Sequence, residues 1–165
     1  MSRHLILLRH ADAEAARPGR RDIERQLSPA GLDQAAATGR WLQERHRPDV
    51  VLCSPATRTR ETLAELGVGA PAEFPDWLYD AGGETIVAGI RELDPSARTA
   101  LVVGHAPGVP AALHELTDPE TSDPEAVRQV ASRFPAGTLA ILRVDQDWAE
   151  VSWGALVAVR LPGDD

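Results

Sequence analysis

Short apolar runs, separated by longer stretches with helical periodicity, set the pattern of this chain. Four of the runs are rich in Val, Leu and Ile and end at turn or charged residues, which is typical of buried strands. They occupy residues 4–8, 49–53, 99–104 and 138–144. A fifth run, residues 150–156 with its continuation over 157–161, follows Asp145-Gln146-Asp147 so closely that it predicts the second arm of a hairpin.

Between the runs, two Ser-Pro pairs indicate helix starts. Ser is a good N-cap, and Pro at the first helical position gives up no hydrogen bond, so helices are expected after Ser28-Pro29 and after Ser54-Pro55. Apolar and small residues at helical spacing follow Ser28, and Pro48 ends that pattern. Further helices are predicted over residues 83–93, 107–116 and 123–134.

Strands that alternate with helices predict parallel βαβ units, with helices on both faces of one sheet. The expected fold is therefore an α/β three-layer α-β-α sandwich, with a mostly parallel central sheet and an antiparallel C-terminal strand. The 165 residues show no internal repeat and no linker, so a single domain over residues 1–165 is expected.

Composition limits the binding partners and the cellular compartment to be expected. The net charge of −8 argues against general binding of nucleic acid, although it is compatible with a small basic pocket. No signal peptide and no apolar stretch of membrane-spanning length is present, and the one cysteine, Cys53, cannot form an internal disulfide. These features predict a cytoplasmic protein. All 17 basic residues are Arg, a bias that hints at a GC-rich, bacterial coding sequence.

Polar side chains follow three of the predicted strands where each strand ends. Arg9 and His10 follow the first, Arg58 lies one turn into the helix after the second, and His105 follows the third. Ligands of parallel α/β sheets bind outside the carboxyl ends of the strands. Taken singly, each histidine could be a polar boundary residue and Arg58 part of a solvated helix face. Their joint placement at one sheet edge favours a functional site.

Two arginines with two histidines suit phosphoryl transfer. Guanidinium groups match phosphate oxygens and keep their charge, and a neutral imidazole can attack phosphorus to form a covalent intermediate. The pattern therefore predicts a phosphohistidine mechanism, with a second, protonated histidine and the arginines neutralising the phosphoryl oxygens.

Other chemistries fit less well. Zinc-ligand spacings are missing, and a chain without Lys cannot carry a P-loop. A cysteine phosphatase would place Arg six positions after Cys53, where Thr59 stands, and Cys53 ends an apolar run, where a buried thiol is expected. Ser54 is expected to be a helix cap rather than a nucleophile.

Four segments carry a family likeness. Arg9-His10-Ala11 resembles the R-H-G or R-H-A signature of the histidine phosphatase (phosphoglycerate mutase-like) superfamily, and residues 25–31 resemble its R-x-L-[ST]-x-x-G segment. Residues 54–62 resemble S-P-x-x-R-x-x-x-T, and Val103-Gly104-His105 resembles the second histidine motif. Ala11, the short length and residues 134–138 make the chain most similar to the SixA-type phosphohistidine phosphatases.

The resemblance implies a phosphoglycerate mutase-like fold and a role for each motif residue. His10 would be the phosphorylated nucleophile, Arg9 and Arg58 would bind phosphoryl oxygens, and His105 would complete the pocket. A SixA-like enzyme would act on phosphohistidine of a protein, such as a histidine phosphotransfer domain, with no metal or organic cofactor. Larger members use a carboxylate as general acid. Asp80 and Glu84 stand in the corresponding stretch without a recognisable acid motif, which favours a phosphoramidate substrate.

Three alternatives remain open. The same pocket could serve a small-molecule phosphomonoesterase, or a non-catalytic module that binds phosphate or a phosphoprotein. A mutase-type transferase is the least favoured, since it needs a closed, water-excluding site. Four arginines after the first motif, at positions 17, 20, 21 and 25, could meet an acidic partner, although a solvated loop is the favoured interpretation.

Overall fold

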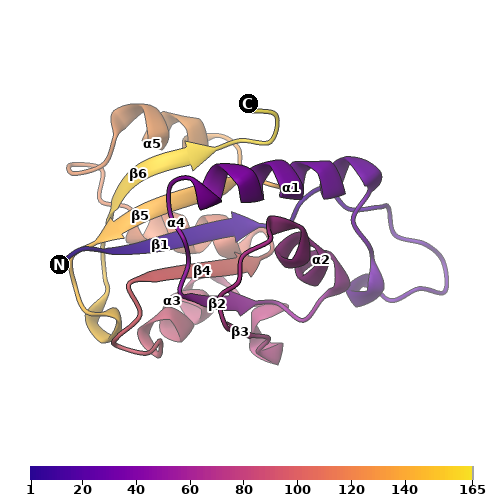
Figure 1. Cartoon of the computed structure of the whole chain (residues 1–165), viewed down its shortest axis with the longest axis horizontal. Coiled ribbons are helices and arrows are strands. Elements are labelled where there is room, and N and C mark those ends of the chain that lie inside the picture. The colour runs from indigo at the N-terminus through magenta and orange to yellow at the C-terminus, as the bar shows by residue number, and fades with distance from the viewer. Residues whose placement is uncertain (165) are drawn as a thin grey trace.

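The computed structural model describes residues 1–164 and shows a six-stranded sheet between layers of helices (Figure 1). The strands lie in the order β3-β2-β4-β1-β5-β6. Their bounds are β1 Arg3–Arg9, β2 Val50–Cys53, β3 Ala72–Glu73, β4 Thr99–Gly104, β5 Leu139–Val144 and β6 Ala155–Arg160. The predicted α/β fold class with a mostly parallel sheet is confirmed.

Strands β3, β2, β4 and β1 pair in parallel, so their arrowheads point to the same side of the molecule (Figure 1). β5 pairs antiparallel with β1, and β6 pairs antiparallel with β5. The predicted C-terminal hairpin is therefore present, and its first arm is the strand that opposes the parallel set. As a result, the start of β5 lies at the same sheet edge as the ends of β1, β2 and β4.

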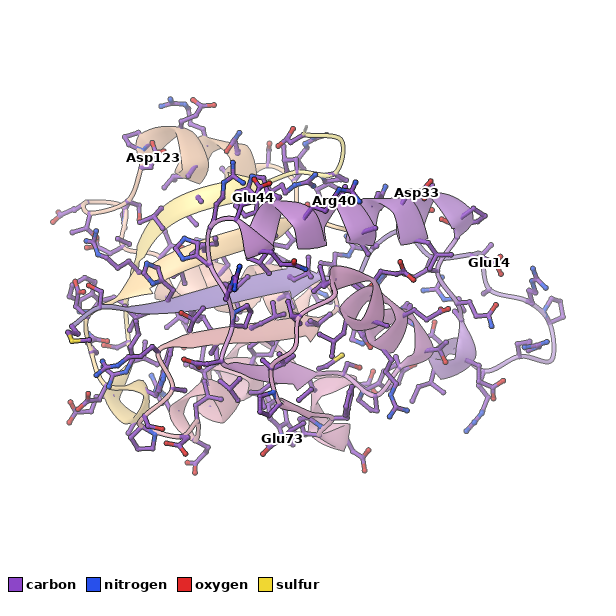
Figure 2. All side chains as sticks on the ribbon, viewed as in Figure 1. Glu14, Asp33, Arg40, Glu44, Glu73 and Asp123 are labelled. Carbon is purple, nitrogen blue, oxygen red and sulfur yellow. The ribbon has the colours of Figure 1, made fainter. Side chains whose placement is uncertain are left out.

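Helices cover both faces of the sheet, with α1 and α2 in front and α3 and α4 behind (Figure 1). Both faces of β1 are buried: Leu5 and Leu7 pack toward α3 and α4, and Ile6 and Leu8 toward α1 and α2. Two of the exposed side chains of α1, Asp33 and Arg40, are charged (Figure 2). None of the helices described within residues 1–164 is long and apolar enough to cross a membrane. The helix bounds are α1 Pro29–Gln43, α2 Thr57–Leu66, α3 Gly83–Arg91, α4 Gly108–Leu116 and α5 Pro124–Ala131.

The last strand differs from its prediction. Residues 150–156, with a continuation over 157–161, were expected to form it, but the strand begins only at Ala155, and a 3-10 turn, η3 (Trp148–Glu150), precedes it. The residues between η3 and the strand form hydrogen bonds elsewhere: the amide of Ser152 donates to the side chain of Gln146 and that of Gly154 to the carbonyl of Leu116, each at 2.7 Å. The two-residue strand β3 was not predicted, because so short a segment carries no periodicity.

The helix-cap role expected of Ser54 is also wrong. Ser28 does cap α1, accepting a hydrogen bond from the amide of Gly31. α2, however, begins at Thr57 with Ala56 as its N-cap residue and has no side-chain cap. The hydroxyl of Ser54 is used at the sheet edge instead.

The start of α1 packs directly on the loop that leaves β1. The amide of Ser28 donates a hydrogen bond to the carbonyl of Asp12 at 3.0 Å, and the Ser28 hydroxyl binds the Asp12 carboxylate at 2.6 Å. Gly31 lies against the same carbonyl, because a Cβ at this position would sit 2.0 Å from its oxygen. This contact fixes the course of the chain just after His10.

We predict that Gly31→Ala destabilises the protein by about 2 kcal/mol or more, because the added methyl group overlaps the backbone of Asp12. Urea unfolding measures the change. Gly69→Ala is the matched control, since no atom lies within 4 Å of its added Cβ, and it should be close to neutral. Equal stability of the two variants would contradict this account of α1 packing.

Candidate active site

The ends of three parallel strands are held side by side by hydrogen bonds that continue the sheet beyond them. The amide of His10 donates to the carbonyl of Gly104, and the amide of Ser54 donates to the carbonyl of Val103, each at 3.0 Å. The residues after β1, β4 and β2 therefore meet at one edge. The structure brings together the four residues predicted there: Arg9, His10, Arg58 and His105.

The His10 ring is buried and has a defined tautomer. Its Nδ1 lies 2.7 Å from the carbonyl oxygen of Ala11, and because a carbonyl can only accept, Nδ1 carries the proton. Burial, together with the charges of Arg58 and Arg9, lowers the pKa of His10 to about 4. The ring is therefore neutral near pH 7, with its lone pair on Nε2. These are the properties of a nucleophile.

The His105 ring lies next to it, with 5.3 Å between the ring centroids. Its Nε2 is 2.7 Å from the Ser54 hydroxyl, which already accepts a hydrogen bond from the amide of Ala56. The hydroxyl proton can thus point at Nε2, which leaves the proton of the neutral ring on Nδ1. This Nδ1 is buried and has no hydrogen-bond partner within residues 1–164.

The structure does not favour the protonated state that was expected of the second histidine. Burial is the main cause that lowers the pKa of His105, followed by the nearby charge of Arg58, and the value is about 3. A neutral His105 can still donate its Nδ1–H to a phosphoryl oxygen. The positive charge of the site comes from its arginines.

Arg9 is a cation without a carboxylate partner in the described part of the chain. Its Nη1 donates to the carbonyl of Phe134 at 2.8 Å, and its Nε is buried without a partner. The amide of Gly137 donates to the carbonyl of His10 at 2.7 Å, and the positive φ of Gly137, 88°, lets the turn before β5 present it. This turn holds the Arg9-His10 backbone in place.

Arg58 is also buried but is paired. Its Nη1 donates to the main-chain carbonyl of Asp22 at 2.9 Å, and its Nη2 donates to Oδ2 of the same residue at 3.1 Å. Asp22 lies in a 3-10 turn, η1 (Asp22–Glu24), on the loop that passes the sheet edge. Its carboxylate also accepts from the hydroxyl of Tyr79 at 2.5 Å and pairs with Nε of Arg25 at 3.2 Å.

Sequence reasoning missed Asp22, Tyr79 and the contact of Ser54 with His105. Tyr79 stands edge-on to the His105 ring, with 5.5 Å between their centroids. The carboxylates expected as possible acids, Asp80 and Glu84, are exposed, and neither shows a hydrogen bond or ion pair with a pocket residue in the described structure. No periodicity and no motif marks a loop residue such as Asp22.

The remaining predictions on chemistry concern cysteine, metals and the loop arginines. Cys53 is buried, and burial raises its pKa to about 12, so the thiol is inert as expected. Within residues 1–164, no group of three or more His, Cys, Asp or Glu side chains could hold a metal ion.

The loop arginines form ion pairs of their own: Arg17 and Arg21 form exposed ion pairs with Glu14 and Glu24, as a solvated loop would. Glu14 marks this loop beyond the end of β1 (Figure 2).

Together these side chains place positive charge and hydrogen-bond donors beside the neutral imidazole of His10. The two buried guanidinium groups have one carboxylate between them among the described residues, which leaves net positive charge at the sheet edge. Three buried nitrogens have no hydrogen-bond partner among residues 1–164: Nε of Arg9, Nε of Arg58 and Nδ1 of His105. Buried donors are costly unless they are satisfied. A tetrahedral oxyanion would satisfy such donors while lying beside Nε2 of His10.

Comparisons with known proteins identify the family to which the chain is similar. Residues 5–79 match the model of the histidine phosphatase superfamily (branch 1). The chain is 37% identical to the uncharacterized protein Rv1276c of Mycobacterium tuberculosis, covering 94% of this chain and 99% of that protein. A candidate phosphohistidine phosphatase SixA from Nakamurella multipartitia has a similar structure, with a TM-score of 0.90, 38% identity and coverage of 99% of this chain and 98% of that one. The protein histidine phosphatase SixA in complex with tungstate has a TM-score of 0.77, 25% identity and coverage of 96% and 97%.

We predict that the His10 and His105 rings stay neutral until the pH falls to about 4 and about 3. An unfolded histidine titrates near ~6.5, so below that pH the unfolded chain binds more protons than the folded one, and the free energy of unfolding falls as the pH drops from 6.5 toward 4. Nuclear magnetic resonance titration of the ring protons measures the pKa values directly. His105→Asn should flatten the pH dependence of stability. A pKa near 6.5 for either ring would refute the burial argument.

Proposed function

The chain belongs to the histidine phosphatase superfamily, and we propose that it is a metal-independent phosphohistidine phosphatase acting on a phosphorylated protein. In this proposal His10 is the nucleophile, Arg9 and Arg58 bind the phosphoryl oxygens, and His105 donates a hydrogen bond to them. The observation that carries the proposal is the hydrogen bond from His10 Nδ1 to the Ala11 carbonyl, which leaves the Nε2 lone pair free beside two guanidinium groups.

In the first step, His10 Nε2 attacks the phosphorus of the substrate phosphohistidine. The new N–P bond forms as the substrate N–P bond breaks, and its electron pair returns to the substrate nitrogen. A substrate ring with a proton on its other nitrogen leaves as neutral imidazole. The enzyme therefore supplies no proton in this step, and its contribution is positioning and charge.

In the second step, water attacks the phosphorus of phosphorylated His10. The N–P bond breaks, its electron pair returns to Nε2, and both protons of the water end on the dihydrogen phosphate product. Nδ1 keeps its proton throughout because the Ala11 carbonyl holds it, so His10 also leaves as neutral imidazole. The two steps thus share one kind of leaving group.

This symmetry favours phosphohistidine over phosphomonoesters as the substrate. An alkoxide leaving group is a strong base and calls for a general acid, whereas Asp80 and Glu84 are exposed and form no hydrogen bond or ion pair with a pocket residue within the described structure. The similarity to a protein histidine phosphatase SixA with bound tungstate, an oxyanion of phosphate-like shape, supports the same substrate class. A histidine phosphotransfer domain is the kind of partner proposed.

We place this activity in bacterial signal transduction and in the cytoplasm. Support for a reducing compartment comes from the single cysteine, Cys53, which is buried and free. Support for a bacterial setting comes from the similarity to the proteins of Mycobacterium tuberculosis and Nakamurella multipartitia. Phosphohistidine on proteins is a signalling intermediate in phosphorelays, which gives such a phosphatase its role.

We predict that His10→Ala lowers kcat by at least ~10³-fold and abolishes the covalent intermediate, because it removes the attacking nitrogen. Wild-type enzyme quenched with ³²P-labelled phosphohistidine substrate should carry an acid-labile, alkali-stable adduct. Cys53→Ala is the matched control and should keep both adduct and turnover, since its thiol is buried. Wild-type turnover without any such adduct would refute the mechanism, and phosphate binding without turnover would indicate a binding module.

We predict a preference for phosphorylated histidine phosphotransfer proteins over phosphomonoesters of at least ~100-fold in kcat/KM, because neither Asp80 nor Glu84 is placed in the described structure to protonate an alkoxide. A panel of both substrate classes at equal ionic strength measures it. The Asp80→Asn and Glu84→Gln variants should retain activity on the phosphoprotein. Preference for the monoesters, together with loss of activity in either variant, would instead identify a small-molecule phosphatase.

A further inference from the structure

We propose that Asp22 is a positioning residue that sets which edge of the Arg58 guanidinium faces the phosphoryl group. The inference rests on the proposed function for its catalytic consequence, and on geometry alone for its effect on anion binding. Asp22 holds Arg58 through two groups, its main-chain carbonyl and its carboxylate. No motif of the chain points to Asp22, and it lies 36 residues before Arg58.

The two contacts occupy one edge of the guanidinium. This group is planar and carries its five N–H donors in a fixed fork. Asp22 takes one donor of Nη1 at 2.9 Å and one of Nη2 at 3.1 Å, which is the end-on edge. The side-on edge, formed by Nε and the second donor of Nη2, remains, and Nε of Arg58 has no partner within residues 1–164. A phosphoryl group can therefore be bound in bidentate fashion by this second edge.

Asp22 also links Arg58 to the second histidine. Its Oδ2 accepts from Arg58 and from the hydroxyl of Tyr79, and the Tyr79 ring stands edge-on against His105. One carboxylate oxygen thus joins the 3-10 turn of η1, the first turn of α2 and the tyrosine beside His105. A shift of this oxygen would move donors on both sides of the bound phosphoryl group.

Removal of the Asp22 carboxylate is expected to change phosphate affinity in opposite directions, depending on whether Asp22 orients Arg58 or acts only through its charge. A carboxylate near a phosphoryl dianion repels it, so removal of the charge alone would tighten phosphate binding. If Asp22 serves mainly to orient Arg58, removal of its carboxylate must weaken phosphate binding despite the lost repulsion. The Asp22 side chain is 53% exposed whereas that of Arg58 is 7% exposed, so Asp22 can be replaced without opening the core.

The test compares three variants with the wild type. Asp22→Ala removes the carboxylate, and Asp22→Asn keeps an acceptor oxygen but removes the charge. Glu24→Ala is the matched control, because Glu24 lies in the same turn and pairs only with the exposed Arg21 in the described structure. Calorimetry measures the affinity for inorganic phosphate, steady-state kinetics on a phosphohistidine substrate gives kcat and KM, and thermal melting verifies the fold.

Asp22→Ala should weaken phosphate binding at least ~10-fold, and Asp22→Asn should restore it to within about 3-fold of the wild type, because hydrogen bonds to a charged group are strong. Glu24→Ala should stay within about 2-fold, since exposed ion pairs contribute little. Unchanged or tighter phosphate binding in Asp22→Ala would overturn the proposal. So would an Asp22→Asn variant that binds phosphate normally but turns over as slowly as Asp22→Ala, since Asp22 would then exchange a proton.

Failure of the proposed function would look different. A wild-type protein that binds phosphate but hydrolyses no phosphohistidine substrate would refute the function, while the phosphate affinities of the variants would still decide the role of Asp22. Conversely, full turnover with unchanged affinities in Asp22→Ala would refute the positioning role and leave the function intact.

Discussion

The parallel register of β2, β4 and β1 is the constraint on which the site depends. Hydrogen bonds from His10 to Gly104 and from Ser54 to Val103 continue this register past the strand ends. Residues far apart in the sequence therefore meet at the carboxyl ends of the strands. The antiparallel β5 starts at the same edge, and the turn before it supplies the carbonyl of Phe134 to Arg9. A displacement of β1, β2 or β4 would separate the Arg9-His10 pair from Arg58 or from His105.

Burial then determines the protonation states of the histidines that the strand register brings together. Burial and two nearby cations keep His10 and His105 neutral, and the Ala11 carbonyl fixes the proton of His10 on Nδ1. The permanent charge comes from the guanidinium groups, which cannot lose it. In the proposed function the neutral His10 is the nucleophile and the guanidinium groups bind the anion, so the mechanism needs neither a metal nor a general acid.

Much of this arrangement could be predicted from the sequence, since apolar runs that end in Arg9-His10 and in His105 are local signals. Contacts made across the fold could not. Ser54-Pro55 has the pattern of a helix start, yet Ser54 binds His105, because tertiary contact outweighs local preference. Asp22 lies in a loop without periodicity, and the neutral state of His105 follows from its burial. That the four site residues act in catalysis stays a prediction.

The most direct test is to identify the nitrogen that carries the phosphoryl group in the trapped intermediate. Protein labelled with ¹⁵N-histidine, reacted with a phosphohistidine substrate and quenched in alkali, can be examined by ³¹P and ¹⁵N magnetic resonance. The account predicts phosphorylation at Nε2 of His10, because the Ala11 carbonyl holds the proton on Nδ1. Phosphate on Nδ1 of His10, on His105, or on no histidine during turnover would contradict it.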